Sequence, residues 1–423
     1  MMRLFIEPTE PLLFRTGRPF DAGENNFAET LFPPTPETLQ GAIRATIAAY
    51  WEPAKTMAEV FQQKKLTDRI GNRTSYGRFR ITAIALGRRL RAHQIGSNIE
   101  RLFPMPAHIL QEEEGENRQA RLLPKLPKEK GVYTNLPDDK HLLYPDPELE
   151  GKLDTTKRWL TESGLRKALS PEQDLAKDDI IKGSDIYTLE PRMGIGMNNT
   201  AKTTEEGLLY QVQMIRMNHK MDPPNQSNLN LERDKDHTSD FSSRYHKLQT
   251  GLTTPYIYGF VIDVSLTQLS ASGITYPEEL VDDNQTQSLL HLPDQGWMVL
   301  GGERRAARFE VVKPSAYTQH QPVEQLQRGN LLYLATPAAF ARGWQPKTWT
   351  YWPEPVAAAI DRYQPIGGWL LAPGSSGGGE QKPMRRCIPA GSVYFFNTSV
   401  NASRPFTDYG TEIGYGITYA GEW

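Results

Sequence analysis

The sequence has little cysteine and no long hydrophobic run. Its single cysteine, Cys387, excludes an intrachain disulfide, and no apolar run approaches the roughly 18 residues of a membrane-spanning helix. It also lacks an excess of charge, because 48 Lys and Arg residues stand against 50 Asp and Glu residues. No charged-then-apolar leader precedes the first predicted strand. We therefore expect a cytoplasmic protein without a membrane partner, on which any basic surface is local.

Sequence signatures of common cofactor sites and catalytic sites are missing as well. The chain has no P-loop, no H-E-x-x-H and no C-x-x-C. Its G-x-G stretches, "GIGMNN" and "IGYG", do not complete a dinucleotide fingerprint. The stretch "GGERR" lacks the paired aspartates that would hold two magnesium ions. We therefore expect neither a cofactor nor a metal site.

Three of the eight histidines, His219, His237 and His246, lie in or beside a polar segment between two predicted strands. An exposed histidine there could act as an acid or a base on an RNA 2′-hydroxyl. A scattered loop histidine is more often simply solvated, so we predict no catalytic residue.

The N-terminal segment predicts a strand, a loop and an amphipathic helix. Residues 3–8 predict a short strand that ends at Pro8, with Leu4 and Ile6 on one face and Phe5 on the other. Thr35 is suited to cap a helix that begins at Pro36. Its apolar stripe consists of Leu39, Ile43, Ile47 and Tyr50.

The remaining strands fall into two cycles. In the first, residues 185–199 and 206–217 predict a hairpin, and strands follow at 256–266 and 296–312. In the second, "GNLLYLATPAAFARGWQP" predicts a strand, a turn and a short helix, and three further strands close the chain. Residues 105–180 and 221–243 have the composition of insertions or mobile loops. Two strand–helix–strand–strand cycles predict an α+β protein with two mostly antiparallel sheets.

Basic residues recur at predicted turns in both cycles. The stretch "FRTGRPFDAGE" places Arg15 and Arg18 in an early loop, where they either bind an anion or pair with Asp21 or Glu24. Residues 71–92 carry six arginines and no acidic residue, so we expect this segment to face RNA or an acidic partner. The predicted RNA-binding side chains are Arg15, Arg18, Arg44, Arg73, Arg88, Arg89, Arg192, Lys202, Arg304, Arg305, Lys382, Arg385 and Arg386.

The last predicted site is the turn formed by Gly414, Tyr415 and Gly416. Two glycines permit positive φ angles and would let backbone amides approach a phosphate, while the tyrosine would offer a face for an unpaired base. The alternative is a turn that serves only to bring the last strand into its sheet.

Several motifs, in order along the chain, resemble one known family. They are "EPTEPLLFRTGRPFDAG", "FPPTPETLQGAIR", "LEPRMGIGMNNTAKTTEEGLLYQVQMIRM", "LGGERRAARFEVV", "LYLATPAAFARGWQP", "PIGGW", "KPMRRCIPAGSVYFF" and "EIGYGITYAGEW". Together they resemble the family of the third subunit of the Cmr complex, the type III-B CRISPR–Cas effector, within the RAMP superfamily.

This resemblance implies an α+β fold of two ferredoxin-like (RRM-like) domains with antiparallel sheets. The first would span residues 1–318, with large insertions near 52–180 and 218–250, and the second residues 326–423. The hairpin around "RMGIGMNN" would correspond to a thumb that bends RNA between subunits.

The resemblance also implies a non-catalytic role in antiviral defence. The protein would bind the repeat-derived 5′ tag of the CRISPR RNA and contact the large polymerase-like subunit and the backbone subunits of the effector. The alternative is a metal-independent RAMP endoribonuclease that processes CRISPR RNA precursors. Against that alternative, the first helix carries Arg44 where a His/Tyr catalytic set would be expected.

Overall fold

A computed structural model describes most of the chain. The described residues are 2–16, 27–90, 98–112, 119–127, 131, 134–148, 151–153, 157–171, 173–198, 200, 203–217, 255–267, 283–312, 323–371 and 379–423. Within these ranges, every helix is too short or too polar to cross a membrane. The fold is α+β, and most of its strand pairs are antiparallel.

The largest sheet has eight strands in the spatial order β13–β14–β1–β12–β3–β4–β8–β9, and all of its neighbours pair antiparallel. It confirms the strands predicted at 3–8, 256–266 and 296–312. The bounds are β1 Met2–Pro8, β3 Phe79–Leu90, β4 Glu100–Pro104, β8 Arg158–Thr161, β9 Ile180–Lys182, β12 Tyr256–Leu266, β13 Gln295–Val299 and β14 Ala306–Val312.

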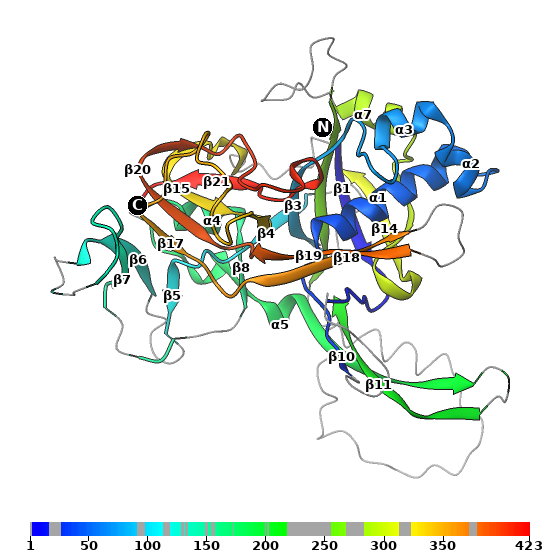
Figure 1. The fold of residues 1–423 in the computed structure, drawn as a ribbon, viewed down its shortest axis with the longest axis horizontal. Helices are drawn as coiled ribbons and strands as arrows, with labels where there is room; N and C mark the ends of the chain where they lie inside the picture. The colour runs from blue at the N-terminus through cyan, green and yellow to red at the C-terminus, as the bar shows by residue number, and fades with distance from the viewer. Residues whose placement is uncertain are drawn as a thin grey trace.

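Helices cover one face of this sheet (Figure 1). Helix α1, Pro36–Trp51, begins as predicted: the Thr35 hydroxyl accepts a hydrogen bond from the Thr38 amide at 3.2 Å, and Pro36 occupies the first turn. Its buried stripe packs on Leu4 and Ile6 of β1. The same core includes residues of α2 (Met57–Phe61), α3 (Lys64–Ile70) and α7 (Asp283–Leu290).

The opposite face of the sheet is partly apolar and partly charged. Phe5, one residue out of phase with Leu4 and Ile6, packs there against Val261 and Val312. Beside it, Arg3 Nε lies 2.7 Å from a carboxylate oxygen of Asp263, and both side chains are buried.

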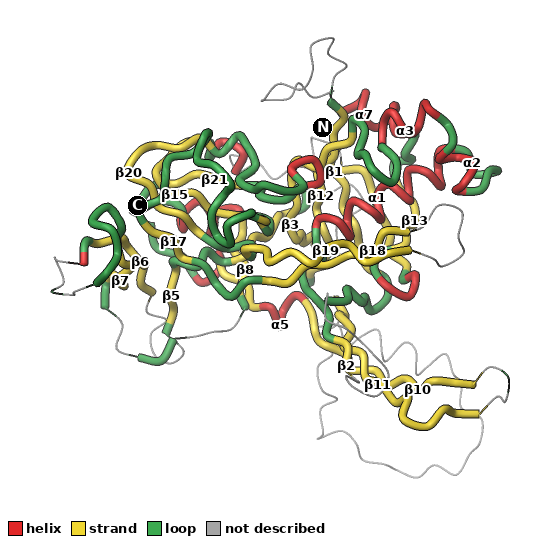
Figure 2. The backbone as a smooth tube through the Cα atoms, in the orientation of Figure 1, coloured by secondary structure: helices red, strands yellow, loops and turns green. Residues whose placement is uncertain are grey.

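The predicted hairpin is confirmed and projects from the body of the protein (Figure 2). It consists of β10, Tyr187–Asn198, and β11, Thr203–Met217, and the short strand β2, Phe27–Ala28, pairs parallel to β11 at Gln211 and Val212. Met214 and Val212 on one face of the hairpin are buried against Leu13.

Much of residues 105–180, predicted as an insertion or mobile loop, is regular structure. β8 and β9 extend the main sheet, and a separate sheet contains β5 Ile109–Gln111, β6 Gln119–Lys125 and β7 Leu142–Asp146. Short helices α4, Glu162–Ala168, and α5, Gly183–Ile186, complete this part.

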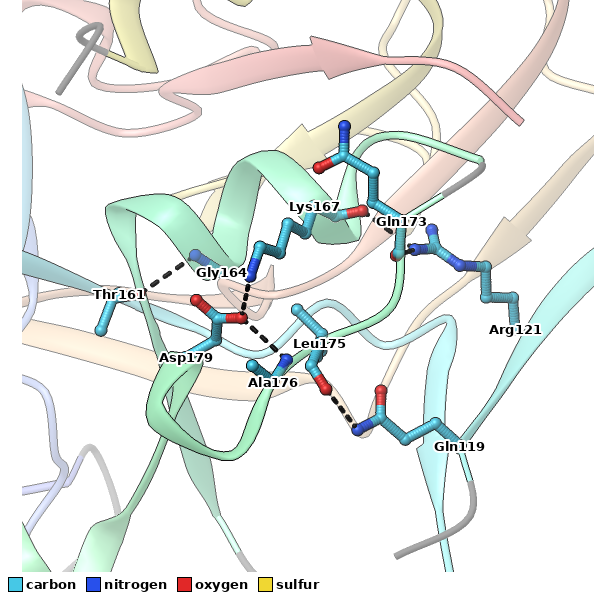
Figure 3. Close-up of polar contacts among 9 residues, drawn as sticks. All are labelled: Gln119, Arg121, Thr161, Gly164, Lys167, Gln173, Leu175, Ala176 and Asp179. Atoms are coloured by element: carbon cyan, nitrogen blue, oxygen red, sulfur yellow. Dashed lines mark hydrogen bonds and ion pairs between the residues drawn. The ribbon is translucent and has the colours of Figure 1, made fainter.

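Arg121 links the small sheet to α4 (Figure 3). Its guanidinium donates to the carbonyls of Lys167 and Ala168, each at 2.9 Å, and to that of Gln173. The last carbonyls of a helix lack partners within it, so a cation placed there both completes their hydrogen bonds and complements the helix dipole. This segment is therefore anchored to the main fold.

The C-terminal part forms two further sheets. One has the order β17–β20–β15–β21, and the other β16–β19–β18. The bounds are β15 Arg328–Leu334, β16 Ala338–Ala339, β17 Ala357–Ala359, β18 Gln364–Leu371, β19 Gly379–Ile388, β20 Val393–Asn401 and β21 Thr418–Gly421.

The short helix predicted after β15 is wrong. Ala338 and Ala339 instead pair with Ile388 and Cys387 of β19, so strand pairing overrides the helical preference of alanine. Residues 323–371 and 379–423 contain short 3₁₀ turns but no α-helix.

The N-terminal and C-terminal parts share a core. Phe103 of β4 and Leu165 of α4 pack with Tyr333 of β15 and Tyr419 of β21. The Tyr333 hydroxyl also donates to the carbonyl of Pro104 at 2.7 Å. The predicted domain division between 318 and 326 stays a prediction, although the described strands on its two sides belong to different sheets.

Candidate RNA interface

A pocket of about 60 Å³ lies where the start of α1 meets β18, β19 and the C-terminal glycine turn. It is therefore built from both ends of the chain. Its lining residues are Glu37, Ile366, Gly367, Lys382, Pro383, Arg385, Tyr409 and Tyr415.

The polar groups of the pocket converge on Glu37. The Tyr409 hydroxyl donates to its carboxylate, and Lys382 Nζ lies 3.6 Å from the same oxygen. The Arg385 guanidinium carbon stacks 3.8 Å from the centroid of the Tyr409 ring. Burial, then the hydrogen bond to Glu37, raises the pKa of Tyr409, so the phenol stays protonated. Two cations face one carboxylate, which leaves a local excess of positive charge.

The glycine turn forms part of the pocket wall, not a phosphate cradle. Gly414 and Gly416 do have positive φ angles, 93° and 67°. However, the amides of Tyr415 and Gly416 donate to the carbonyls of Gly410 and Pro337, at 3.1 and 2.9 Å. Tyr415 is 1% exposed, so its ring offers no face to a base. The RNA-contact prediction for this turn is therefore replaced by a structural role.

Three further predicted arginines make contacts within the fold. Arg44 is half-buried and donates to the carbonyl of Asn72 at 2.8 Å, and burial lowers the pKa of its guanidinium. Arg73 pairs with Glu380 of β19 at 2.8 Å. Arg386 lies over the ring of Tyr363, 5.4 Å from its centroid.

The arginine-rich segment does not face outward as predicted. Arg89 is 5% exposed, and its guanidinium pairs with Glu310 at 2.9 Å and with Glu7 at 3.1 Å. Arg88 pairs with Glu100 at 2.7 Å and lies over the Tyr256 ring. The segment lacks acids of its own, but the fold brings carboxylates from other strands to it. For Arg88 and Arg89, this pairing within the fold corrects the prediction that the segment faces RNA or an acidic partner.

The other predicted side chains lie away from the pocket. Arg192, on the projecting hairpin, pairs with Glu190 at 2.7 Å. Arg304 is exposed in the turn between β13 and β14, and the neighbouring Arg305 pairs with Glu303. Arg15 is exposed and its backbone bridges to Thr30.

Several predictions lie outside the described residues. They concern Arg18 with its possible partners Asp21 and Glu24, Lys202, and the loop histidines His219, His237 and His246. Among the residues that the structure does describe, no cluster of three or more His, Cys, Asp or Glu side chains could hold a metal ion.

Comparison with protein families identifies the chain. The family model described as CRISPR-associated protein (Cas_Cmr3) matches residues 4–423. The chain belongs to the Cas_Cmr3 family. No curated protein matches it.

Members of type III complexes are among the similar solved structures, at low identity. A chain of type III-B Cmr-beta bound to cognate target RNA and AMPPnP has 15% identity and a TM-score of 0.39, covering 93% of this chain and 86% of that one. A chain of type III-B Cmr-beta bound to cognate target RNA has 13% identity, a TM-score of 0.41 and the same coverage. A chain of the Csm3-Csm4 subcomplex of a type III-A interference complex has 11% identity and a TM-score of 0.30, covering 95% of this chain and 94% of that one.

Sequence reasoning about this Cas_Cmr3 protein missed part of the site. Glu37 and Tyr409 organise the pocket although they lie 372 residues apart, and no local pattern joins them. Outside the pocket, sequence reasoning also missed the exposed Trp297, although the alternation in "GWMVL" places it opposite the buried Met298. That alternation was available in the sequence.

Proposed function

We propose that this Cas_Cmr3 family protein is a non-catalytic subunit of a type III CRISPR effector. In this role it binds the repeat-derived 5′ tag of the CRISPR RNA and contacts the large polymerase-like subunit and the backbone subunits. The family match over residues 4–423 supports membership in the effector. The observation that carries the RNA-binding role is the pocket in which Lys382 and Arg385 flank a single carboxylate.

The pocket suits a phosphate of single-stranded RNA. Arg385 offers a planar fork that matches phosphate oxygens, and Lys382 supplies a compact charge. The Tyr409 hydroxyl donates a hydrogen bond to Glu37, and the Tyr409 ring stacks on the Arg385 guanidinium.

The strand order supports a ferredoxin-like N-terminal domain. Four neighbouring strands of the main sheet lie side by side in the order β14–β1–β12–β3. Together with α1 and α7, they follow one another along the chain as β1, α1, β3, β12, α7 and β14. This is the βαββαβ order of that fold. The C-terminal sheet β17–β20–β15–β21 has four antiparallel strands but no α-helix in its described residues, so it matches an RRM-like domain in its sheet alone.

The projecting hairpin supports the thumb role. Met193, Ile195 and Met197 alternate along β10 and are 70%, 52% and 49% exposed, and Leu209 opposite Ile195 is 49% exposed. Exposed apolar side chains on a projecting element can be inserted between neighbouring bases. On the other face, Glu190 binds both Arg192 and Arg216, which fixes the hairpin locally.

A binding and cleavage assay tests the proposal. Labelled tag RNA and a scrambled RNA of equal length are titrated with the full chain in EDTA at several salt concentrations, and the RNA is then checked for products. We expect preference for the tag and intact RNA. Lys382→Gln and Arg385→Gln should each reduce the slope of log affinity against log salt by about 0.7, the value for one phosphate contact on a single strand.

Lys55→Gln is the matched control, because it removes the same charge beyond the far end of α1. Glu37 of the pocket and Trp51 at the end of that helix are 14 residues apart, which separates them by about 21 Å at 1.5 Å per residue. Equal binding of tag and scrambled RNA would overturn the tag-binding role. Accumulation of a single cleavage product in EDTA would instead support the endoribonuclease.

A further inference from the structure

Trp297 is a large exposed side chain on an edge strand of the main sheet. It is 60% exposed, and Val299, two residues further on the same face of β13, is 52% exposed. The intervening Met298 is buried in the core beneath α1. Trp297 and Val299 therefore lie on the sheet face opposite to α1, at the edge formed by β13.

The backbone beneath Trp297 is fixed. Its amide donates to the Tyr50 hydroxyl of α1 at 3.2 Å. A Cβ at the preceding Gly296 would lie 2.3 Å from that hydroxyl, so glycine is what lets the helix approach the strand this closely. The indole is thus presented from a backbone held on both sides, by β14 and by α1.

The cation beside Trp297 is Arg308, its cross-strand partner on β14. Arg308 Nη2 donates to the side-chain oxygen of Gln295 at 2.7 Å, a neutral amide that orients the guanidinium without cancelling its charge. Glu7 of β1 is the cross-strand partner of Arg308 on its other side. The Glu7 carboxylate pairs with Arg89.

We propose that Trp297, Val299 and Arg308 form a stacking platform for one unpaired base of single-stranded RNA. The base lies on the indole with its edge against Val299, and Arg308 binds the adjacent phosphate. Two apolar side chains form too small an apolar surface for the core of a protein interface, whereas one indole face beside a cation matches one nucleotide. The inference rests on the proposed RNA-binding function and adds a second contact on a different face.

The test uses the full chain and two fluorescein-labelled probes, tag RNA and oligouridine, because stacking tolerates any base. Trp297→Ala should weaken binding of both probes by about 5- to 150-fold, the range for loss of one stacked base. Trp297→Phe should retain most of the affinity, since it keeps an aromatic face. Arg308→Gln should reduce the salt slope by about 0.7. Thermal melting confirms that each variant is folded.

The outcomes separate this platform from the proposed function. If the wild-type chain binds neither RNA, the proposed function fails and the platform fails with it. If the wild-type chain binds and Trp297→Ala binds equally well, the platform alone is overturned. Unchanged RNA binding by Trp297→Ala together with lost co-purification of other effector subunits would also overturn it, and would make β13 a protein-docking edge.

Discussion

Replacing Gly416 by alanine tests whether the glycine turn has a structural role or binds an RNA phosphate. The Gly416 amide already donates to Pro337, and its carbonyl accepts from the Phe406 amide at 2.7 Å. A Cβ at this position would lie 2.6 Å from the carbonyl oxygen of Phe406. We therefore expect Gly416→Ala to destabilise the fold and to affect RNA binding only by reducing the folded fraction.

The expected loss in the free energy of unfolding has two contributions. Placing alanine at a φ of 67° costs about 1–2 kcal/mol, because the left-handed region is unfavourable for a residue with a Cβ. Crowding against the Phe406 carbonyl adds about 1–3 kcal/mol. The free energy of unfolding should thus fall by about 2–5 kcal/mol.

Gly343→Ala is the matched control. Gly343 has a φ of 76° but nothing within 4 Å of an added Cβ, so only the conformational cost of about 1–2 kcal/mol applies. Urea unfolding of both variants gives the stability, and titration of folded protein with tag RNA gives the affinity. A Gly416→Ala chain with wild-type stability and clearly weakened tag binding would refute this reasoning and restore the cradle.

Two further predictions concern buried charged or titratable groups. Arg89→Ala should lower the free energy of unfolding by about 3–5 kcal/mol, since it leaves Glu310 buried without its partner. Arg88→Ala should lower it by only about 1–2 kcal/mol, and urea unfolding compares the two variants. If Arg89→Ala lowered the slope of log RNA affinity against log salt, that result would contradict the buried position of Arg89. Burial, then the charge of Arg121, lowers the pKa of His108 from 6.5 to about 3, so the folded chain keeps this imidazole neutral while the unfolded chain binds a proton. Stability should therefore decrease as the pH falls below 6.5, at up to ~1.4 kcal/mol per pH unit until about 3. His108→Gln should make the unfolding midpoint less dependent on pH between these values, and an unchanged dependence would refute the assignment.

Elements with a strong local signal were predictable. The Thr35 cap, Pro36 and the apolar stripe define α1 without tertiary information. The apolar runs of β1 and β12 indicate strands, and the two-residue period of a strand places Leu4 and Phe5 on opposite faces. The helix predicted after β15 failed because two alanines prefer a helix in isolation but pair with β19 in the fold.

The site was less predictable, because charge neutralisation depends on distant residues. Arg89 and Glu310 lie 221 residues apart and meet only when β1 and β14 assemble beside β12 and β3. The composition of 71–92 therefore indicated a basic surface that the sheet buries. Lys382 and Arg385 do lie at a pocket, but Glu37, which organises them, comes from α1.

Crosslinking within an assembled effector tests whether this chain contacts the 5′ tag of the CRISPR RNA. A CRISPR RNA with 4-thiouridine in its 5′ tag is assembled with all subunits, irradiated, and the crosslinked peptides of this chain are identified. We expect crosslinks on β19 and the Tyr409 segment around the pocket, with the RNA uncut. Tag crosslinks confined to other subunits, in an effector that contains this chain, would contradict this expectation.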